Sequence, residues 1–367
     1  MALLCATAVA VLPATPAQAD QVRDNQWHLR YLKVVEAHRI TQGAGVTVAV
    51  IDTGVDPHPD LRNNLLSGTD IHPGGRGNGQ ADDDGHGTQM AGLIAGHGRP
   101  GSRGVLGIAP SAKLLPIDYV SKADPSNPDN AAAGIDWAVS KGAKVISIAS
   151  AGTPTPELQS SVNAALEKDV VIVAGGGNTR TFLVGYPAAY AGVVAVSAAD
   201  KSGNRADFAA TGSEIVISAP GVDIYSTSPG GGYETNSGTS PATAIVAGAA
   251  ALVRSKYPDL SAREVVHRLT ATAADKGARG RDEEYGYGVL NLVGALTADV
   301  PPLEGAAEPS ASAAPSPTAG NPDAAAPDRD NSGSTTVLVS LGAVGVLVVL
   351  GFLIALLVLL ARRRSAE

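Results

Sequence analysis

Four residues in this sequence have side chains that could together perform nucleophilic catalysis: Asp52, His86, Asn178 and Ser240. A serine hydroxyl is a weak nucleophile at neutral pH and needs a neighbouring base, for which histidine is well suited. An aspartate can hold that histidine in the correct tautomer, and an amide can donate to the oxyanion that forms when a carbonyl is attacked. The chain order Asp, His, Ser is one of the orders in which these groups recur.

Each of the four also has a purely structural interpretation. Asp52 and Asn178 follow apolar runs, where such residues commonly form turns. His86 lies between two glycines, which allow other backbone to approach it, although a lone histidine is usually structural or solvated. Ser240 precedes Pro241, and proline is favoured in the first turn of a helix. Ser240 is therefore either a helix N-cap or a nucleophile beside a helix dipole, and only the combination of all four residues argues for catalysis.

The elements that must position these residues alternate between strands and helices. Short β-branched runs that predict buried strands are 46–51, 113–117, 145–148, 170–173, 193–196 and 215–218. Stretches that predict helices lie between them, at 86–96, 130–141, 156–168 and 240–256. This alternation predicts an α/β fold with a mostly parallel sheet covered by helices on both faces. Ligands of such sheets bind beyond the carboxyl ends of the strands, where Asp52 and Asn178 are expected.

Two other polar segments carry weaker signals. The segment 20–42 is too short to form an independent inhibitory prodomain. Its sequence at 26–29 and 34–38 predicts one short helix packed on the domain. His28 and His38 are expected at its surface. Asp82 to Asp84 predict a solvated loop or a weak cation site, not catalytic groups.

Both ends of the chain have the character of targeting segments. Residues 2–12 are apolar, and the small residues that follow them end in Ala17-Gln-Ala19, which predicts a signal peptide over 1–19 that is cleaved after Ala19. The single cysteine, Cys5, would leave with it, so the mature chain would have no disulfide. Residues 337–361 are uncharged and long enough to span a bilayer, and the basic tail 362–367 marks the cytoplasmic side. Residues 301–336, rich in Pro, Ala and Ser, predict a disordered stalk.

Composition limits what the remaining residues, 20–300, can do. The chain has 367 residues, a formal net charge of −8 and a 44% hydrophobic share, which is enough for one large domain or two small ones, and between the terminal segments one domain is expected. Nucleic-acid binding would require a basic patch, so it is not expected. The predicted signal peptide and the predicted membrane span together indicate a single-pass protein of the cell membrane, with its folded domain outside the cell.

These motifs in this order resemble the subtilisin-type serine proteases, over about residues 42–292. The main motifs are 48–56, which contains Asp52, 85–88, which contains His86, and 238–240, which ends in Ser240. Lesser matches are 58–61, 107–110, 218–221 and 286–291. Within the family, the chain most resembles the mycosins, membrane-anchored subtilases that accompany type VII secretion. That narrower resemblance depends on Gln26-Trp-His28, the stalk, the terminal span and the basic tail.

The resemblance implies a three-layer fold and a role for each residue. Asp52 would orient His86, His86 would act as general base and then acid, and Ser240 would attack the scissile carbonyl. Asn178 and the Ser240 backbone N–H would form the oxyanion hole. The edge strand that pairs with substrate backbone would contain Ser147, Ala149, Ser150, Ala151 and Gly152.

The implied function is an endopeptidase acting on polypeptides, with secretion components as partners and with no cofactor or metal. The alternative is a catalytically weak scaffold of a secretion complex on the same fold. Retention of all four catalytic groups argues against the scaffold, because a pure scaffold has no physical need for Asp52 or Asn178. Another acyl-transfer enzyme is disfavoured because the flanking motifs are typical of peptidases.

Overall fold

The computed structural model describes residues 17–72, 74–75, 77–101, 103–120, 127–179 and 183–303. The predicted span and basic tail lie outside the described residues, as do all but the first three residues of the predicted stalk and most of the predicted signal peptide. Within these ranges, no helix combines the length and the apolar character needed to cross a membrane. The chain divides into two units, 1–306 and 307–367, and the fold described below belongs to the first.

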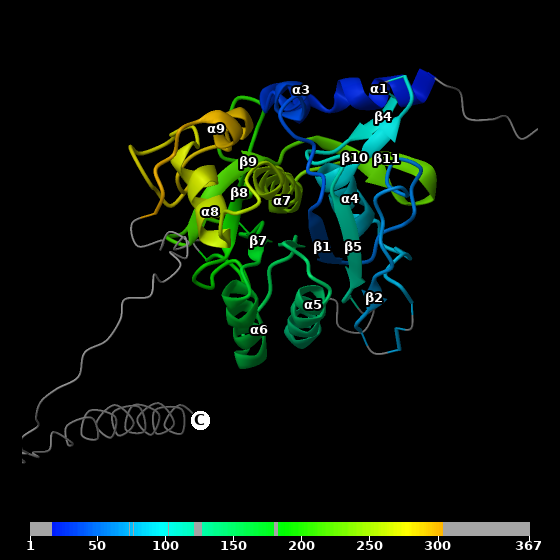
Figure 1. The fold of residues 1–367 in the computed structure, drawn as a ribbon, viewed down its shortest axis with the longest axis horizontal. Helices are drawn as coiled ribbons and strands as arrows, with labels where there is room; N and C mark the ends of the chain where they lie inside the picture. Colours follow the sequence, from blue (N-terminus) through cyan, green and yellow to red (C-terminus); the bar gives the residue numbers. More distant parts are fainter. Residues whose placement is uncertain are drawn as a thin grey trace, which may run out of the picture. The chain divides into compact units, whose positions relative to one another are not determined.

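A sheet of seven strands forms the centre of this unit (Figure 1), and every pairing within it is parallel. Its order is β2 (Thr69–Asp70), β5 (Lys113–Asp118), β1 (Thr47–Asp52), β6 (Val145–Ile148), β7 (Val171–Gly175), β8 (Val194–Ala199) and β9 (Ile215–Pro220). The six predicted strands are confirmed to within one or two residues at most ends. Only β2, two residues long, was not predicted, because its sequence has no apolar run.

The central strands are apolar throughout because both of their faces are covered. In β1, Val48 and Val50 belong to one core cluster, while Ala49 and Ile51 belong to the other. All four are at most 1% exposed. Successive side chains of a strand point to opposite faces, so this alternation places a separate core on each side of the sheet.

Four helices supply most of the covering layers. Helices α4 (His86–Ala95) and α7 (Thr239–Lys256) pack together on one face. Helices α5 (Pro128–Ser140) and α6 (Pro156–Glu167) cover the other, and Figure 1 shows them below the sheet. The side chains of Asn127 and Thr155 cap α5 and α6, each directly before a proline at the first helical position. The predicted three-layer fold is thus confirmed.

Two strand pairs, a 3-10 turn and two further helices complete the unit. Two antiparallel pairs are β3 (His97–Arg99) with β4 (Arg103–Leu106) and β10 (Ile224–Ser228) with β11 (Gly232–Asn236). A 3-10 turn, Pro229–Gly231, joins the second pair. Helices α8 (Ala262–Ala271) and α9 (Leu292–Thr297) follow α7.

A fully buried carboxylate connects the two antiparallel pairs. Asp60 Oδ1 accepts from Arg99 Nε of β3 at 2.7 Å, and Oδ2 accepts from Tyr233 Oη of β11 at 2.8 Å. Oδ2 also accepts from the backbone N–H of Val105 in β4 at 2.8 Å. Asp60 is 0% exposed, and these donors replace the water that its charge would otherwise require.

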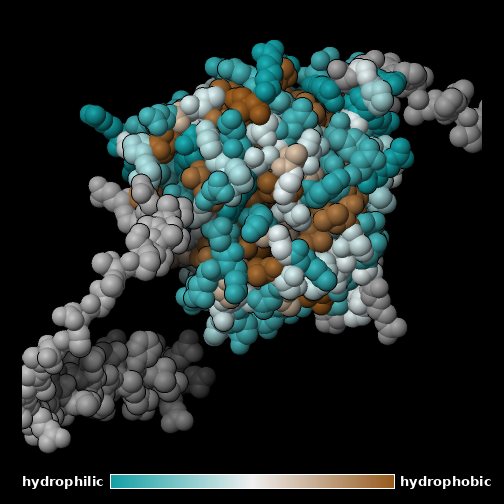
Figure 2. Space-filling model, viewed as in Figure 1, coloured by the Kyte–Doolittle hydropathy of each residue, from teal (hydrophilic) through white to brown (hydrophobic). Residues whose placement is uncertain are grey.

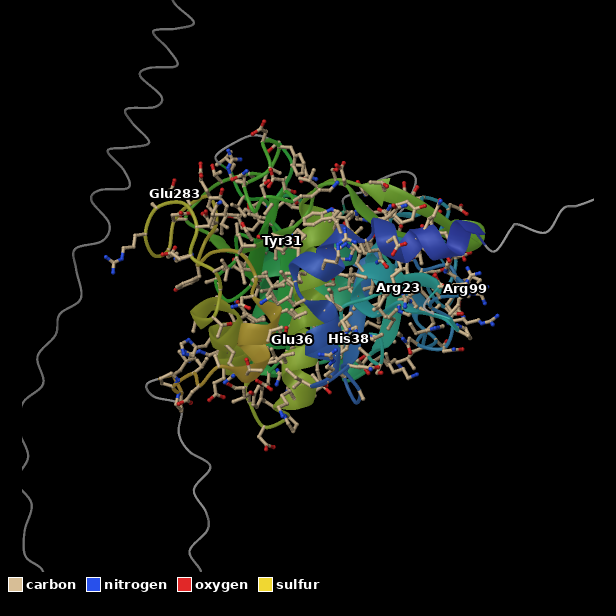
Figure 3. All side chains as sticks on the ribbon, turned by 90° about the horizontal axis from the view of Figure 1, so that it is seen from above. Arg23, Tyr31, Glu36, His38, Arg99 and Glu283 are labelled. Carbon is tan, nitrogen blue, oxygen red and sulfur yellow. The ribbon has the colours of Figure 1, made fainter. Side chains whose placement is uncertain are left out.

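The N-terminal segment differs from its prediction. Instead of one short helix it forms α1 (Ala17–Asn25), α2 (Trp27–Tyr31) and α3 (Val34–His38), which lie across the molecule in Figure 3. A left-handed residue, Lys33 (φ 52°), separates α2 from α3. The expected surface position of His28 is wrong: it is 0% exposed, and burial lowers its pKa to about 3. His38 is partly buried, with Nε2 2.9 Å from the Ile108 carbonyl oxygen.

On the surface, apolar residues appear as separate patches among hydrophilic ones in the view of Figure 2. The largest fully buried side chains, such as Ile51, Met90, Leu93 and Ile146, lie instead in the two core clusters. The sheet is therefore held rigidly from both sides, and its strand ends can position side chains accurately.

Candidate active site

Asp52 and His86 form a close pair at the carboxyl end of β1. Asp52 is the last residue of the strand and is 4% exposed, while His86 is the first residue of α4. Asp52 Oδ1 lies 2.7 Å from His86 Nδ1 and also accepts from the Thr53 backbone N–H at 2.9 Å. A neutral imidazole that donates from Nδ1 has its acceptor lone pair on Nε2. The His86 side chain is 27% exposed, so a substrate can reach it.

Close backbone contact makes this pair possible. A Cβ on Gly87 would lie 2.0 Å from the Gly54 carbonyl oxygen and 3.2 Å from the Cβ of Asp52. Position 85, just before the helix, has a φ of 99°, a left-handed conformation that favours glycine. The glycines on both sides of His86 are thus required by geometry.

Asp82 is a residue whose role was missed from the sequence. The expectation of a solvated loop is wrong for it, since it is 8% exposed. Its Oδ1 accepts from Thr53 Oγ1 at 2.8 Å and from the Gly85 N–H at 2.7 Å, and its Oδ2 accepts from both Thr88 N and Thr88 Oγ1. This carboxylate therefore ties the loop before His86 to the end of β1. The only sequence signal was its place four residues before His86.

The electrostatics of the pair favour a protonated imidazole. The negative charge of Asp52 is the main cause of the raised pKa of His86, and burial opposes it. The carboxylates of Asp82 and Asp84 act in the same direction. An imidazolium formed during proton transfer would thus be stabilised, which is the role that an aspartate plays beside a catalytic base.

Ser240 is not a helix N-cap. Helix α7 begins at Thr239 and its N-cap is Gly238, so Ser240 lies in the first turn. Backbone N–H groups of a first turn have no partner within the helix, and the helix dipole there favours negative charge. Pro241, the third helical residue, lacks an N–H that would have been unpaired in any case. The structure therefore excludes one of the two interpretations of Ser240.

The Ser240 hydroxyl donates to the Ala149 carbonyl oxygen at 2.8 Å. Ala149 follows β6, the neighbour of β1, so the serine lies at the same edge of the sheet as Asp52. In the described part of the chain, no hydrogen bond joins Ser240 to His86. Transfer of the hydroxyl proton to His86 Nε2 therefore requires the Ser240 hydroxyl to exchange its bond to Ala149 for one to His86.

Asn178 is exposed, and its amide is held in one orientation by Thr239. Its Oδ1 accepts from the Thr239 backbone N–H at 2.8 Å and from Thr239 Oγ1 at 3.1 Å. Because a backbone N–H can only donate, the other end of the amide must be the NH₂ group, which remains a donor. A Cβ on Gly238 would lie 3.2 Å from that Nδ2, so the amide is beside the start of α7.

The predicted substrate strand is corrected at two of its residues. Ser147 is 1% exposed inside β6, paired with Val50 of β1 and Val173 of β7, so it cannot reach a substrate. β6 ends at Ile148, and the Gly152 N–H and carbonyl already bond to Tyr186 at 2.7 and 3.0 Å. The local sequence did not reveal this because the strands that pair with Ser147, and Tyr186 that pairs with Gly152, are distant in the chain.

Ala149, Ser150 and Ala151 therefore remain the candidates for substrate contact. Ser150 Oγ accepts from Tyr119 Oη at 2.8 Å, and Ala151 is exposed. The Ala151 methyl is close to the opposite segment: a Cβ on Gly185 would lie 2.6 Å from it. The methyl thus occupies space between the two segments that a glycine would leave open.

The carboxyl edge of this parallel sheet carries an acidic side chain, an imidazole and a serine at the start of a helix. These are the groups of a serine-type hydrolase. Residues 43–288 match the profile of the subtilase family. Subtilisin Savinase of Lederbergia lenta is 40% identical over 268 residues, which cover 72% of this chain and 96% of that protein. The alkaline protease of Shouchella clausii is 40% identical over 268 residues, covering 72% of this chain and 68% of that protein. The chain belongs to the subtilase family and is a serine endopeptidase.

Solved structures of mycosins are also similar to this fold. MycP1 with its N-terminal propeptide removed has a TM-score of 0.69 and 32% identity, covering 75% of this chain and 98% of that one. MycP3 protease from the type VII (ESX-3) secretion system has a TM-score of 0.66 and 36% identity, covering 74% and 88%. The resemblance to mycosins predicted from the sequence is thus confirmed.

Proposed function

We propose that this protein is a membrane-anchored extracellular endopeptidase with Asp52, His86 and Ser240 as its triad. The observation that carries the proposal is the 2.7 Å bond between Asp52 and His86 at the strand edge that also holds Ser240. Asn178 and the Ser240 backbone N–H are proposed to bind the oxyanion. Thr239 supports this role because it fixes the direction of the Asn178 amide.

The reaction would proceed through an acyl-enzyme. The Ser240 oxygen attacks the scissile carbonyl carbon while its proton passes to His86 Nε2. The resulting oxyanion accepts hydrogen bonds from Asn178 Nδ2 and the Ser240 N–H. When the C–N bond breaks, His86 gives the proton to the leaving amine, and water activated by His86 then hydrolyses the ester. Asp52 keeps Nδ1 protonated throughout, so Nε2 is the reacting nitrogen.

Ala149 would have two roles in this cycle. Its carbonyl oxygen accepts from the Ser240 hydroxyl in the free protein. A substrate lying along 149–151 would bring a backbone N–H that can donate to the same oxygen in β-strand fashion. Substrate binding would then release the hydroxyl to turn toward His86.

The location and partners are proposed from the sequence and from the similar structures. Residues 1–19 would direct export, 337–361 would span the membrane, and 301–336 would connect the span to the domain. One solved relative, MycP1, is described as an essential component of the type VII (ESX-1) secretion system. We therefore propose that a type VII secretion system supplies substrates or binding partners for this chain. Extraction of cell membranes with alkaline carbonate would test the anchor, because a spanning protein stays with the membrane.

A scaffold with weak or absent catalysis is the second candidate. The bond from Ser240 to Ala149, instead of to His86, is the observation that favours it. If that bond persisted with substrate present, the hydroxyl would never reach its base.

Labelling with a fluorophosphonate probe distinguishes the two candidates, because the probe reacts with activated serines. The full chain would be labelled in detergent and the modified residue located by mass spectrometry. Label on Ser240, absent in Ser240→Ala and retained in Ser237→Ala, supports the peptidase. Ser237 is an exposed serine three residues away and serves as the matched control. No label on the folded wild type would refute the triad and favour the scaffold.

A further inference from the structure

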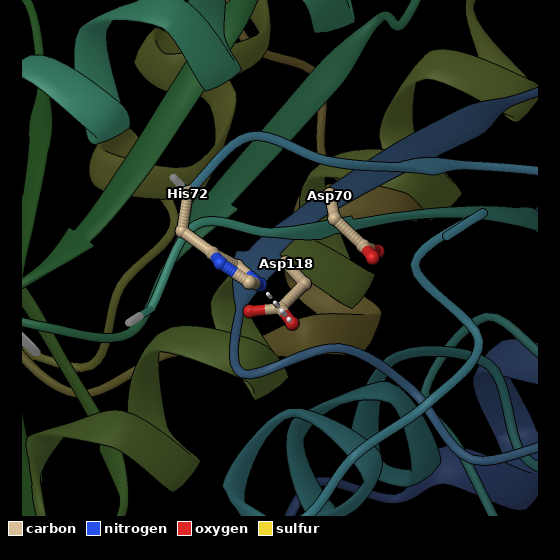
Figure 4. A group of neighbouring side chains, drawn as sticks. All are labelled: Asp70, His72 and Asp118. Carbon is tan, nitrogen blue, oxygen red and sulfur yellow. Dashed lines mark hydrogen bonds and ion pairs between the residues drawn. The ribbon is translucent and has the colours of Figure 1, made fainter. Parts of the chain in front are cut away.

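Three side chains capable of binding a metal meet at the outer edge of the sheet, beside the triad. Asp70 ends β2 and Asp118 ends β5, and the parallel register pairs them directly. His72 follows β2 by two residues, and Figure 4 shows its ring directed at Asp118, with Asp70 nearby. One ligand atom from each of the three lies within 4.8 Å of the others.

The spacing of two of these atoms already suits a shared ion. His72 Nε2 lies 3.2 Å from Asp118 Oδ2. Two ligands of a tetrahedral Zn²⁺, each about 2.0–2.1 Å from the ion, are roughly 3.4 Å apart. An ion could therefore enter between them with little rearrangement, and a small movement would bring in the Asp70 carboxylate.

Backbone donors orient both carboxylates. Asp70 Oδ2 accepts from the Gly77 N–H at 2.6 Å, and its Oδ1 accepts from the Gly79 N–H at 3.0 Å. Asp118 Oδ1 accepts from the Val120 N–H at 3.1 Å, which leaves Oδ2 facing His72. Each carboxylate oxygen has two lone pairs, so one remains available for an ion. Such outer hydrogen bonds are what hold the ligands of metal sites in place.

The loop that follows Asp70 is fitted to this carboxylate. A Cβ on Gly77 would lie 2.4 Å from Asp70 Oδ2, and a Cβ on Gly75 would lie 2.5 Å from Asp70 Cβ and 3.2 Å from the His72 ring. Only glycine lets the loop approach so closely. The close packing of this loop therefore fixes the position of the Asp70 carboxylate, which a freely exposed surface charge would not have.

The donor set selects the class of ion. Ca²⁺ and Mg²⁺ are bound by oxygen ligands, whereas an imidazole nitrogen with carboxylates suits Zn²⁺ and similar divalent transition metals. The His72 and Asp118 side chains are 21% and 17% exposed, so water can supply a further ligand. We propose that Asp70, His72 and Asp118 form a binding site for a divalent transition metal of the Zn²⁺ type.

The position of the site suggests what the ion would do. Asp118 is also the register neighbour of Asp52 on β1, and the next residue, Tyr119, donates its N–H to the Asp52 carbonyl at 3.1 Å. The Tyr119 hydroxyl donates to Ser150 on the proposed substrate segment. An ion joining β2 to β5 would therefore fix the strand that connects Asp52 to Ser150. Its role would be structural, because none of its ligands belongs to the triad.

Metal titration of the full chain tests the site independently of peptidase activity. The purified chain, stripped with a chelator, would be titrated with Co²⁺ and followed by its visible absorption, and then with Zn²⁺ in competition with a chromogenic chelator. One Zn²⁺ per chain and a rise in Tm with Zn²⁺ are expected. His72→Gln and Asp118→Asn should each weaken binding roughly tenfold or more, since even outer-shell changes cost 10–100-fold.

His267→Gln is the matched control, since His267 is a partly buried histidine on α8, outside the cluster. It should bind as the wild type does. Circular dichroism would establish that each variant is folded, and Asp70→Asn supplies a third variant if one of the others is not. The proposal is overturned if the folded wild type binds no stoichiometric metal, because the pair of His72 and Asp118 is then a simple ion pair. It is also overturned if binding survives in the folded ligand variants, because the metal then lies elsewhere.

Discussion

Gly87→Ala should damage catalysis strongly through a single methyl group. The added Cβ would lie 2.0 Å from the Gly54 carbonyl oxygen. Carbon–oxygen contacts are ordinarily about 3.3 Å or longer, so the backbone beside His86 must move by about 1.3 Å. A misplacement near 1 Å can lower the rate about a hundredfold, so kcat/KM should fall by that order.

Hydrolysis of a chromogenic peptide would measure this loss, with circular dichroism and Tm to establish folding. Gly142→Ala is the control, because Gly142 has a φ of 76° and no atom within 4 Å of an added Cβ. It should cost about 1–2 kcal/mol of stability, as a left-handed alanine does, but leave the rate unchanged. A folded Gly87→Ala protein with kcat/KM within threefold of wild type would show that the contact does not position His86.

Three further outcomes are expected. Asp52→Asn removes the charge that raises the pKa of His86, so the acidic limb of the pH profile of kcat/KM should move to lower pH, while the maximal rate falls by roughly 10⁴-fold, as in a comparable triad; an unmoved limb would contradict this assignment. Ala151→Gly should open the space that the methyl fills, so a peptide library should show larger side chains accepted before the cleaved bond; an unchanged preference would place that pocket elsewhere. Arg99→Ala should lower the free energy of unfolding by about 2–3 kcal/mol in urea, since Asp60 stays buried without its cation but keeps its other donors; a loss under 0.5 kcal/mol would show that those donors suffice.

The types of the proposed catalytic residues and the positions of the main strands could be predicted from the sequence because both depend on local patterns. A continuous apolar run such as 171–174 predicts a strand covered on both faces, and this prediction does not require knowing which strands lie beside it. Asp52 is also placed by local sequence alone, because it follows such a run directly. The same is true of His86, whose flanking glycines mark a crowded helix start.

Local patterns failed where the answer depended on a partner distant in sequence. Ser147 looks like an exposed strand residue until β1 and β7 are seen on both sides of it. His28 looks like a surface histidine until the N-terminal helices are seen packed on the domain. Neither the periodicity nor the composition of those segments specifies which neighbours will cover them.

The sequence by itself therefore determined the fold class, the residues of the proposed triad and the resemblance to subtilases. Only the tertiary structure decided that Ser240 is not a cap and that Thr239 aims the Asn178 amide. It also decided that Asp70, which is 48 positions from its register partner Asp118, lies beside it. The physical reason is that residue type and spacing fix short-range geometry, whereas strand register and helix packing set which distant side chains share an environment.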